Sequence, residues 1–360
     1  RTARHETERA FRAVAEAAEE AKRIHGETIP ADTVPEGEGR TAVCLYQPVG
    51  VVAAVTPFNH PLNQVAHKAA PAIAAGNAVL LKPSEKTPLT ALRFARILLE
   101  AGLPAQNLAV VLGEAERIVP ALVGHAQVDM VSFTGSRDVG ARILAACGIK
   151  KVLLELGGND ALIVDEDADL DAAVRVAIPG AFGNNGQRCT SIKRLLLHDA
   201  VADRFLERFV AEARRLVTGD PREERTDVGP LIDAGAADRV ESRIRSAVAR
   251  GAVLLLGGGR TGNLIPPTIL DRVRPEHEIV VEETFGPTAP VLRVRDMEDA
   301  IRIANDTAYG LQAGVFTRDL GKALRAAREL RTGAVMINEG PGFRIETLPF
   351  DVIVGNPPWV

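Results

Sequence analysis

The run Val51-Val52-Ala53-Ala54-Val55, followed by Thr56-Pro57-Phe58-Asn59-His60-Pro61, sets the fold expected for the first half of the chain. Five apolar residues without a polar interruption are typical of a strand buried on both faces, and the residues that follow favour a turn. Four more short apolar runs come after it, separated by stretches with helical spacing. The predicted strands are residues 51–55, 78–81, 108–112, 130–133 and 151–154, and the predicted helices are residues 62–75, 88–101, 115–123 and 137–147. The alternation predicts an α/β fold with a parallel, doubly wound sheet.

In such a sheet ligands bind beyond the carboxyl ends of the strands, and here those ends carry polar residues. Lys82 and Glu85, after the second strand, could hold ribose hydroxyls and groups on the adenine side of a nucleotide. Ser136 by itself is a helix N-cap, but the N–H groups of Thr134-Gly135-Ser136 could also receive a pyrophosphate. No Gly-x-Gly-x-x-Gly follows the first strand, so the sheet topology predicts a nucleotide site without the common fingerprint.

A second α/β unit with its own core is expected after Gly158. The predicted strands are residues 161–164, 193–197, 253–255, 290–294 and 334–338, and the predicted helices are residues 170–177, 201–216, 234–250, 297–305 and 320–330. The division of the chain is therefore predicted as residues 1–158, residues 159–338 and a return segment at residues 339–350.

Two stretches carry reactive side chains. Gly186-Gln187-Arg188-Cys189-Thr190 places a cysteine in a polar, glycine-punctuated loop, and Leu154-Glu155-Leu156-Gly157-Gly158 ends an apolar run on a carboxylate. A thiolate nucleophile and a carboxylate that moves a proton are the minimum equipment for covalent chemistry on a carbonyl carbon. Cys44 and Cys147 are interpreted as small buried hydrophobes instead.

Composition narrows the class of partner. Lys and Arg number 43 against 47 Asp and Glu, for a net charge of -4, which gives no basic surface for nucleic acid or membrane. The three cysteines are widely spaced and form no Cys-x-x-Cys pair, so neither a disulfide framework nor a metal site is favoured and a cytoplasmic location fits best. A helix over residues 6–25 is followed by short strands within residues 27–48, which are a plausible partner surface.

Seven motifs, in order along the chain, resemble the aldehyde dehydrogenase superfamily over residues 1–350. They are Pro57-Phe58-Asn59, Lys82-Pro83-Ser84-Glu85, Phe133-Thr134-Gly135-Ser136, Glu155-Leu156-Gly157-Gly158, Gly186-Gln187-Arg188-Cys189, Glu282-Glu283-Thr284-Phe285-Gly286-Pro287 and Asn305-Asp306-Thr307-Ala308-Tyr309-Gly310-Leu311. The resemblance implies a Rossmann-like NAD(P)-binding domain, a catalytic α/β domain and oxidation of an aldehyde to a carboxylic acid. It also implies a homodimer or homotetramer, in which residues 27–48 supply the oligomerisation strands.

The resemblance also assigns roles to residues. Cys189 would attack the aldehyde carbon, the Asn59 amide and the Cys189 backbone N–H would stabilise the alkoxide, and Glu155 would activate the water that hydrolyses the thioester. The apolar neighbours of Glu155 are expected to raise its pKa toward useful base strength. The cofactor residues implied are Thr56, Pro57, Phe58, Lys82, Ser84, Glu85, Phe133, Gly135, Ser136, Leu156, Gly157, Glu283 and Phe285.

The choice of cofactor and substrate depends on a few charged side chains. The Glu85 carboxylate suits the free ribose hydroxyls of NAD, so NAD is preferred, with NADP possible. Arg188 and Arg344 suggest a small aldehyde with an anionic or polar tail, because guanidinium groups pair with carboxylate and phosphate. The alternative for both arginines is a structural role, with Arg344 paired to Glu346 or another acid.

The last ten residues depart from the family pattern. Asn356-Pro357-Pro358-Trp359 resembles the base-binding motif of adenine-N6 DNA methyltransferases, and residues 351–360 look foreign to the preceding chain. The chain is therefore expected to be truncated at both ends, with weaker assembly than a complete enzyme. A hydrolytic aldehyde dehydrogenase is the favoured function. The alternatives are an acylating relative that uses coenzyme A, which Glu155 opposes, an inactive remnant and, remotely, a methyltransferase.

Overall fold

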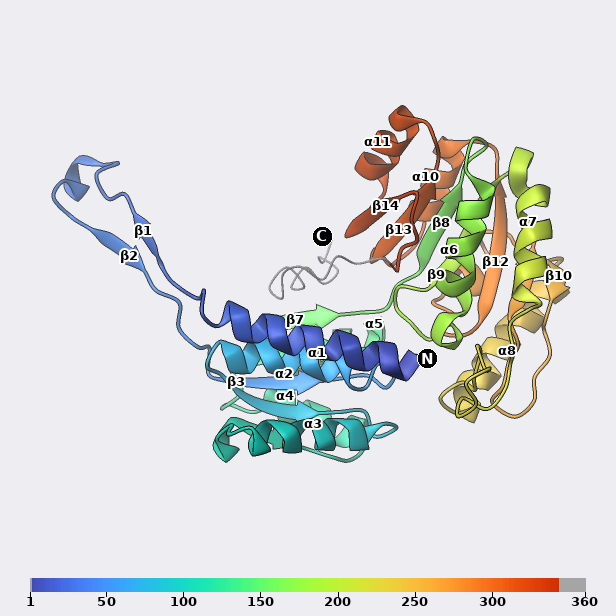
Figure 1. Ribbon diagram of the computed structural model, residues 1–360. Coiled ribbons are helices and arrows are strands. Elements are labelled where there is room, and N and C mark those ends of the chain that lie inside the picture. Colours follow the sequence, from blue (N-terminus) through green and yellow to red (C-terminus); the bar gives the residue numbers. More distant parts are fainter. Residues whose placement is uncertain (1, 343–360) are drawn as a thin grey trace. The chain divides into compact units, whose positions relative to one another are not determined.

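A computed structural model describes residues 2–342 of the protein. The chain forms two compact units, the first ending at Glu155 and the second beginning at Leu156 (Figure 1). Each has its own sheet, as the two series of apolar runs predict. Within residues 2–342 no helix is long and apolar enough to cross a bilayer.

The first unit contains a five-stranded sheet in which every pair of neighbours is parallel. Its order is β5-β4-β3-β6-β7. The strands are β3 (Val51–Val55), β4 (Ala78–Lys82), β5 (Leu108–Val110), β6 (Met130–Thr134) and β7 (Lys151–Glu155). The helices that connect them are α2 (Asn63–Ala74), α3 (Pro88–Glu100), α4 (Ala115–Gly124) and α5 (Arg137–Cys147), with a short 3-10 helix, η2 (Ala105–Asn107), before β5. The order reverses between β3 and β6, so the sheet is doubly wound as predicted.

Two further elements precede this sheet. The first helix, α1 (Thr2–Glu20), packs along α2, and a hairpin of β1 (Glu27–Ile29) and β2 (Ala42–Cys44) projects from the unit (Figure 1). A short 3-10 helix, η1 (Pro35–Gly37), lies in the hairpin's connection. The helix was predicted over residues 6–25 but ends at Glu20, because the backbone N–H groups of Lys22 and Arg23 donate to carbonyls three residues back and tighten the chain into a turn.

The second unit contains a seven-stranded sheet of order β10-β11-β12-β9-β8-β13-β14. Its strands are β8 (Asp160–Val164), β9 (Ile192–His198), β10 (Val253–Leu256), β11 (Thr268–Asp271), β12 (Thr288–Val294), β13 (Gln312–Phe316) and β14 (Ala334–Ile337). All neighbours are parallel except β10, which runs antiparallel to β11 at one edge. The helices are α6 (Leu170–Phe182), η3 (Gly183–Gly186), α7 (Asp199–Ala213), α8 (Ala234–Ala249), α9 (Glu278–Val281), α10 (Met297–Asn305) and α11 (Leu320–Glu329).

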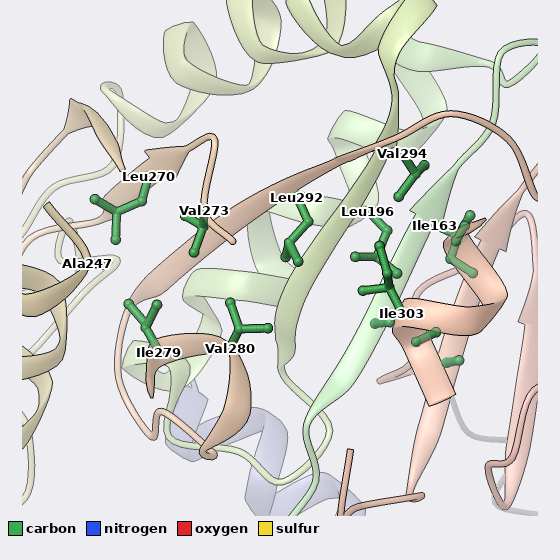
Figure 2. Close-up of a cluster of buried hydrophobic side chains, with 14 of the residues drawn as sticks. Ile163, Leu196, Ala247, Leu270, Val273, Ile279, Val280, Leu292, Val294 and Ile303 are labelled. Carbon is green, nitrogen blue, oxygen red and sulfur yellow. The ribbon is translucent and has the colours of Figure 1, made fainter. Parts of the chain in front are cut away.

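Two hydrophobic clusters hold this second sheet in place. One joins β8, β9, β12 and β13 to helices α8, α9, α10 and α11, and Figure 2 shows Leu196, Leu292 and Ile303 within it. The other packs α6 and α7 on the sheet through Phe182, Phe205 and Phe209, whose rings stack at centroid distances of 5.5 and 5.7 Å. Strand residues alternate between the clusters, as Leu162 and Ile163 do, so the sheet is buried on both faces.

Strands β11 and β13 were not predicted from the sequence. Strand β13 lies between β8 and β14 and is buried throughout, although it begins with Gln312-Ala313-Gly314, residues that disfavour strands. Its position is set by neighbours: Gln312 N–H donates to Asp160 Oδ1 at 3.1 Å, and residues 313–316 pair with β8. Tertiary pairing therefore overrides local propensity in this strand.

Candidate functional site

The first unit presents polar residues at the point where its strand order reverses. Strands β3 and β6 are neighbours there, and connections leave them toward opposite sides of the sheet. Thr56-Pro57-Phe58-Asn59 follows β3, and Gly135 and Ser136 follow β6. Open parallel sheets bind ligands at such a switch point because the loops diverge and leave a crevice. The sequence-predicted residues Thr56, Asn59, Gly135 and Ser136 thus belong to adjacent strand ends.

The residues at this edge fit a nucleotide. The hydroxyls of Thr56 and Thr134 are buried and have no hydrogen-bond partner among residues 2–342, as expected of groups that bind a polar ligand. Ser136 Oγ caps α5 by accepting from Val139 N–H at 3.4 Å. The first turn of that helix therefore begins at Ser136, and the first turn of a helix is a position that favours an anion. Phe133 is buried in β6, and Pro57 and Phe58 are half-buried.

Lys82 and Glu85 form an ion pair at the next strand end. Lys82 Nζ lies 2.8 Å from Glu85 Oε2, and the lysine is 1% exposed while the carboxylate is partly open to solvent. Burial, the largest single effect, acts to raise the pKa of Glu85, but the hydrogen bond and charge of Lys82, together with a backbone hydrogen bond and the charge of Lys86, outweigh it, and the pKa is lowered. The charge of Glu85 is therefore partly neutralised by its partner. Ser84 Oγ accepts from Lys86 N–H at 3.3 Å and shapes the same turn.

Asn59 lies in the turn that follows β3, and Glu155 is the last residue of β7. Asn59 Oδ1 accepts from His60 N–H at 3.1 Å. Because this bond engages the oxygen of the side-chain amide, the amide's NH2 group is the end that can donate to a ligand. Glu155 is half-buried, and its backbone carbonyl accepts from Gly135 N–H at 3.0 Å, tying β7 to the end of β6. The two predicted catalytic residues of this unit are thus held by backbone hydrogen bonds.

Lys68 is a candidate functional residue that sequence analysis missed. It is 7% exposed within α2, its Nζ donates to Ser132 Oγ at 3.2 Å, and it interacts electrostatically with Glu155. Burial lowers the pKa of Lys68 to about 8, and the Glu155 carboxylate offsets part of that effect. The available signal was that α2, an Ala-rich helix, contains no other Asp, Glu, Lys or Arg.

We expect Lys68→Met to stabilise the protein at neutral pH. A lysine whose pKa is about 8 when folded and 10.5 when unfolded is charged in both states below pH 8, where its burial opposes folding by on the order of 3 kcal/mol. Between pH 8 and pH 10.5 the lysine is neutral in the folded state but still protonated in the unfolded state. Raising the pH in this window therefore favours the folded state, and the penalty is gone near pH 10.5. Thermal melts should show the variant more stable at pH 7 and equal to the wild type near pH 10.5.

The matched control is Lys150→Met. Lys150 Nζ donates to Val123 O at 2.8 Å in the same unit, and this variant should not reproduce the pH-dependent gain. A Lys68→Met protein that is less stable than the wild type at pH 7 would show that the ammonium stabilises its site. A more stable variant that turns over more slowly would instead mark Lys68 as a residue kept for function.

In the second unit Cys189 lies in a segment we call the nucleophile loop, residues 183–190, between α6 and β9. Asn184 and Asn185 have φ of 51° and 58°, and Asn185 is fixed by a bond from its Nδ2 to Pro230 O at 3.0 Å. Gly186 has φ of +67°, and a Cβ there would collide with the carbonyl of Gly286. The loop is therefore held in a conformation that this sequence of Asn and Gly permits. Cys189 is half-buried.

Arg188 is engaged with the backbone. Its Nη2 donates to Pro179 O at 2.7 Å and to Gly180 O at 2.9 Å, near the end of α6. These bonds satisfy carbonyls close to a helix terminus and brace the nucleophile loop. They correspond to the structural role that sequence analysis left open beside substrate binding. Arg344, the other predicted substrate residue, and the tail at residues 351–360 lie outside the described part of the chain.

Glu283 and Phe285 form a second cluster in this unit, with Gly157. Gly158 N–H donates to Glu283 Oε1 at 3.2 Å, and a Cβ on Gly157 would collide with the same carboxylate, so the backbone after Leu156 must be glycine. Burial raises the pKa of Glu283, and Lys193 offsets part of that shift. A carboxylate accepts hydrogen bonds from hydroxyl groups, so Glu283 suits recognition of a ribose.

Lys193 lies beneath this cluster and was also missed. It is 3% exposed in β9, its Nζ donates to Gly186 O at 2.9 Å and lies 4.9 Å from the centroid of the Phe285 ring. Burial lowers the pKa of Lys193 to about 8, while Glu283, Asp160 and Cys189 act in the opposite direction. Residues 193–197 were predicted as a strand, and a lysine at the start of an otherwise largely apolar strand was the signal available in the sequence.

Together, a doubly wound sheet with polar strand ends and a loop-borne cysteine define an NAD(P)-linked dehydrogenase class, and comparison with known proteins makes the family explicit. Residues 1–351 match the aldehyde dehydrogenase family, and the chain belongs to that family. The resemblance stated from seven motifs is confirmed. The family uses NAD(P).

Three similar proteins show how closely the chain follows its family. It is 43% identical over 350 residues to a 3-sulfolactaldehyde dehydrogenase of Priestia aryabhattai, covering 97% of this chain and 73% of that protein. The NADP-dependent glyceraldehyde-3-phosphate dehydrogenase of Bacillus halodurans, solved with NADP, has a TM-score of 0.91 and 39% identity over 93% of this chain and 71% of its own. Aldehyde dehydrogenase 21 of Physcomitrella patens, in complex with the reaction product succinate, has a TM-score of 0.92 and 39% identity over 95% of this chain and 71% of its own.

Proposed function

We propose that this protein oxidises a small aldehyde with an anionic tail to the corresponding carboxylic acid, with NAD(P) as the hydride acceptor and Cys189 as the nucleophile. The observation that carries the proposal is the nucleophile loop, in which Cys189 is half-buried and the residues before it are fixed by hydrogen bonds from Asn185 and Arg188. A cysteine in a rigid polar loop beside a buried ammonium has the surroundings of a reactive thiol, whereas Cys147 is buried near the end of an ordinary helix.

The proposed chemistry assigns one task to each residue. Cys189 Sγ attacks the aldehyde carbon, and the Asn59 amide NH2 and the Cys189 backbone N–H donate to the oxygen that becomes an alkoxide. A bound nicotinamide would supply the hydride acceptor for this oxidation. A thioester on Cys189 is then hydrolysed by a water from which Glu155 takes a proton, and Lys68 stabilises the carboxylate form of Glu155.

The cofactor is assigned to two groups of residues. Thr56, Ser136 and the Lys82–Glu85 pair would hold its phosphates and ribose in the first unit, and Glu283 would hold the nicotinamide ribose in the second. Because Lys82 already neutralises part of the Glu85 charge, a 2'-phosphate meets less repulsion than an isolated carboxylate would impose. The pair therefore supports use of NADP as well as NAD, which tempers the preference for NAD drawn from Glu85 alone.

The names of similar proteins support the substrate class. Sulfolactaldehyde, glyceraldehyde-3-phosphate and succinate all carry an anionic group. In this chain Arg188 is engaged by the carbonyls of Pro179 and Gly180, so we assign recognition of the tail to Arg344. Arg188 then acts by bracing the loop.

The test compares carboxylated, sulfonated and phosphorylated short aldehydes with an alkyl aldehyde of equal length. We expect kcat/KM to be at least about tenfold higher for the anionic set, the equivalent of about 1.4 kcal/mol from a charge-assisted pair. Arg344→Ala should remove that preference and leave the neutral aldehyde unchanged, whereas Arg188→Ala should slow both. Equal turnover of all aldehydes would refute the substrate class, and coenzyme A dependence would indicate the acylating alternative.

A further inference from the structure

Lys193 is a buried cation without a carboxylate partner in the part of the chain that the structure describes. It is 3% exposed, and no ion pair within 4.0 Å is found for it among residues 2–342. Its contacts are a hydrogen bond to Gly186 O at 2.9 Å and a position 4.9 Å from the Phe285 ring centroid. Burying an ammonium without an adjacent counter-ion is costly, so its retention calls for a role that an apolar residue cannot fill.

The two contacts of Lys193 connect segments that the proposed function uses together. Gly186 belongs to the nucleophile loop, and Phe285 belongs to the segment of residues 283–287, which begins with Glu283. The same two segments also touch through their backbones, because Gly186 packs against the carbonyl of Gly286. Lys193 therefore reaches both the loop that carries the thiol and the segment assigned to the nicotinamide ribose.

The charged groups that act on Lys193 come from several elements. Cys189 and Arg188 lie in the nucleophile loop, Asp160 begins β8, and Glu283 follows α9. Burial raises the pKa of Asp160 well above its usual range, and burial also raises that of Glu283, so both carboxyls are weakened as counter-ions. The positive charge of Arg188 acts to lower the pKa of Lys193. A thiolate at Cys189 is then an anion that this site favours.

We infer that Lys193 is a positioning residue for the proposed reaction: it ties the nucleophile loop to residues 283–287 and supplies the buried positive charge that favours the Cys189 thiolate. The inference rests on the proposed role of Cys189 as nucleophile. It predicts that the reactivity of the thiol toward a neutral reagent depends on Lys193, whether or not an aldehyde is present.

The first experiment measures alkylation of Cys189 by iodoacetamide between pH 5 and 10, followed by peptide mass spectrometry. Lys193→Met should slow alkylation at pH 7 about tenfold and move its midpoint up by about one pH unit, because the thiolate loses its nearby cation. Lys193→Gln removes the charge but retains an N–H donor for Gly186 O. Lys150→Met, which removes another ammonium bonded to a backbone carbonyl, should leave the alkylation profile unchanged.

The two variants separate the two roles of Lys193, namely the positive charge that favours the thiolate and the link between the nucleophile loop and residues 283–287. Slow alkylation in both Lys193→Met and Lys193→Gln supports the charge role, and weaker cofactor binding by calorimetry in Lys193→Met alone supports the tether. Normal alkylation in both folded variants overturns the inference. Normal alkylation in Lys193→Gln with a slow Lys193→Met overturns the charge role.

A reciprocal measurement on the wild-type lysine guards against variants that do not fold. With 13C-labelled lysine, the NMR titration midpoint of Lys193 should fall when Cys189 is changed to Ser, because the thiolate helps to keep the ammonium protonated. An unchanged midpoint would overturn the inference. Neither measurement needs turnover, so a Cys189→Ala protein that still oxidises aldehydes would refute the proposed function by itself.

Discussion

Replacing Cys189 with alanine is expected to reduce NAD(P)H formation by a factor on the order of 10⁴ or more, to below detection in a standard absorbance assay. The reason is that the thiol forms the covalent bond from which the rest of the proposed reaction proceeds. Hydride transfer from a free or hydrated aldehyde would lack the alkoxide that the thiohemiacetal supplies. The measurement is the rate of absorbance increase at 340 nm, a standard wavelength for reduced nicotinamide, with a saturating anionic aldehyde.

Two other cysteines provide the controls for that substitution. Cys44→Ala changes a half-buried residue in β2, and Cys147→Ala changes a buried one that ends α5. Both variants should retain turnover, with only a loss of stability in the second. Cofactor affinity of Cys189→Ala, measured by calorimetry, should stay near the wild-type value. Residual turnover within tenfold of the wild type would remove Cys189 from the mechanism.

Replacing Glu155 with glutamine is expected to slow the second half of the reaction by about 10² to 10⁴, the usual range for loss of a general base. The amide keeps the size of the side chain but cannot take a proton from water. The first turnover should therefore proceed, giving a burst of one NAD(P)H for each active chain, and the thioester should accumulate on Cys189. Intact-protein mass spectrometry should show a mass increase equal to the acyl group.

Hydroxylamine separates a lost base from a damaged fold. It attacks a thioester without help from a protein base, so it should restore turnover of the Glu155→Gln protein. Glu100→Gln, which changes an exposed carboxylate paired with Arg96 on α3, is the control that should behave as the wild type. A full steady-state rate with no acylated protein would exclude Glu155 as the base. Rapid release by coenzyme A but not by water would favour the acylating alternative.

Two buried lysines can each contribute a change in rate to the pH profile. Lys68 and Lys193 both have pKa values lowered to about 8, so a change in rate near pH 8 has two candidate sources in two different units. Lys68→Met removes the first and Lys193→Gln the second. Because both ammonium groups titrate near the same pH, the assignment requires these variants in addition to the wild-type profile.

Much of the fold follows from local sequence. Continuous apolar runs such as residues 51–55 can be buried on both faces, which requires helices on each side and hence a parallel sheet. Helix starts were equally local where a cap was present, as with Ser136 before α5 and Asp233 before α8. Strand β13 escaped prediction because only Val315 and Phe316 of its five residues favour a strand, and its place depends on β8.

The sequence by itself determined the family, the alternation of elements and the residue types at the strand ends, because each depends on neighbours along the chain. It left Arg188 with two possible roles, and it gave Lys68 and Lys193 no role at all. Only the tertiary structure shows what these side chains contact, because it bonds Arg188 to carbonyls of α6, buries Lys68 against Ser132 and places Lys193 near both Gly186 and Phe285. The pKa of a buried ammonium depends on the solvent excluded and the charges brought near it, and both are fixed by packing.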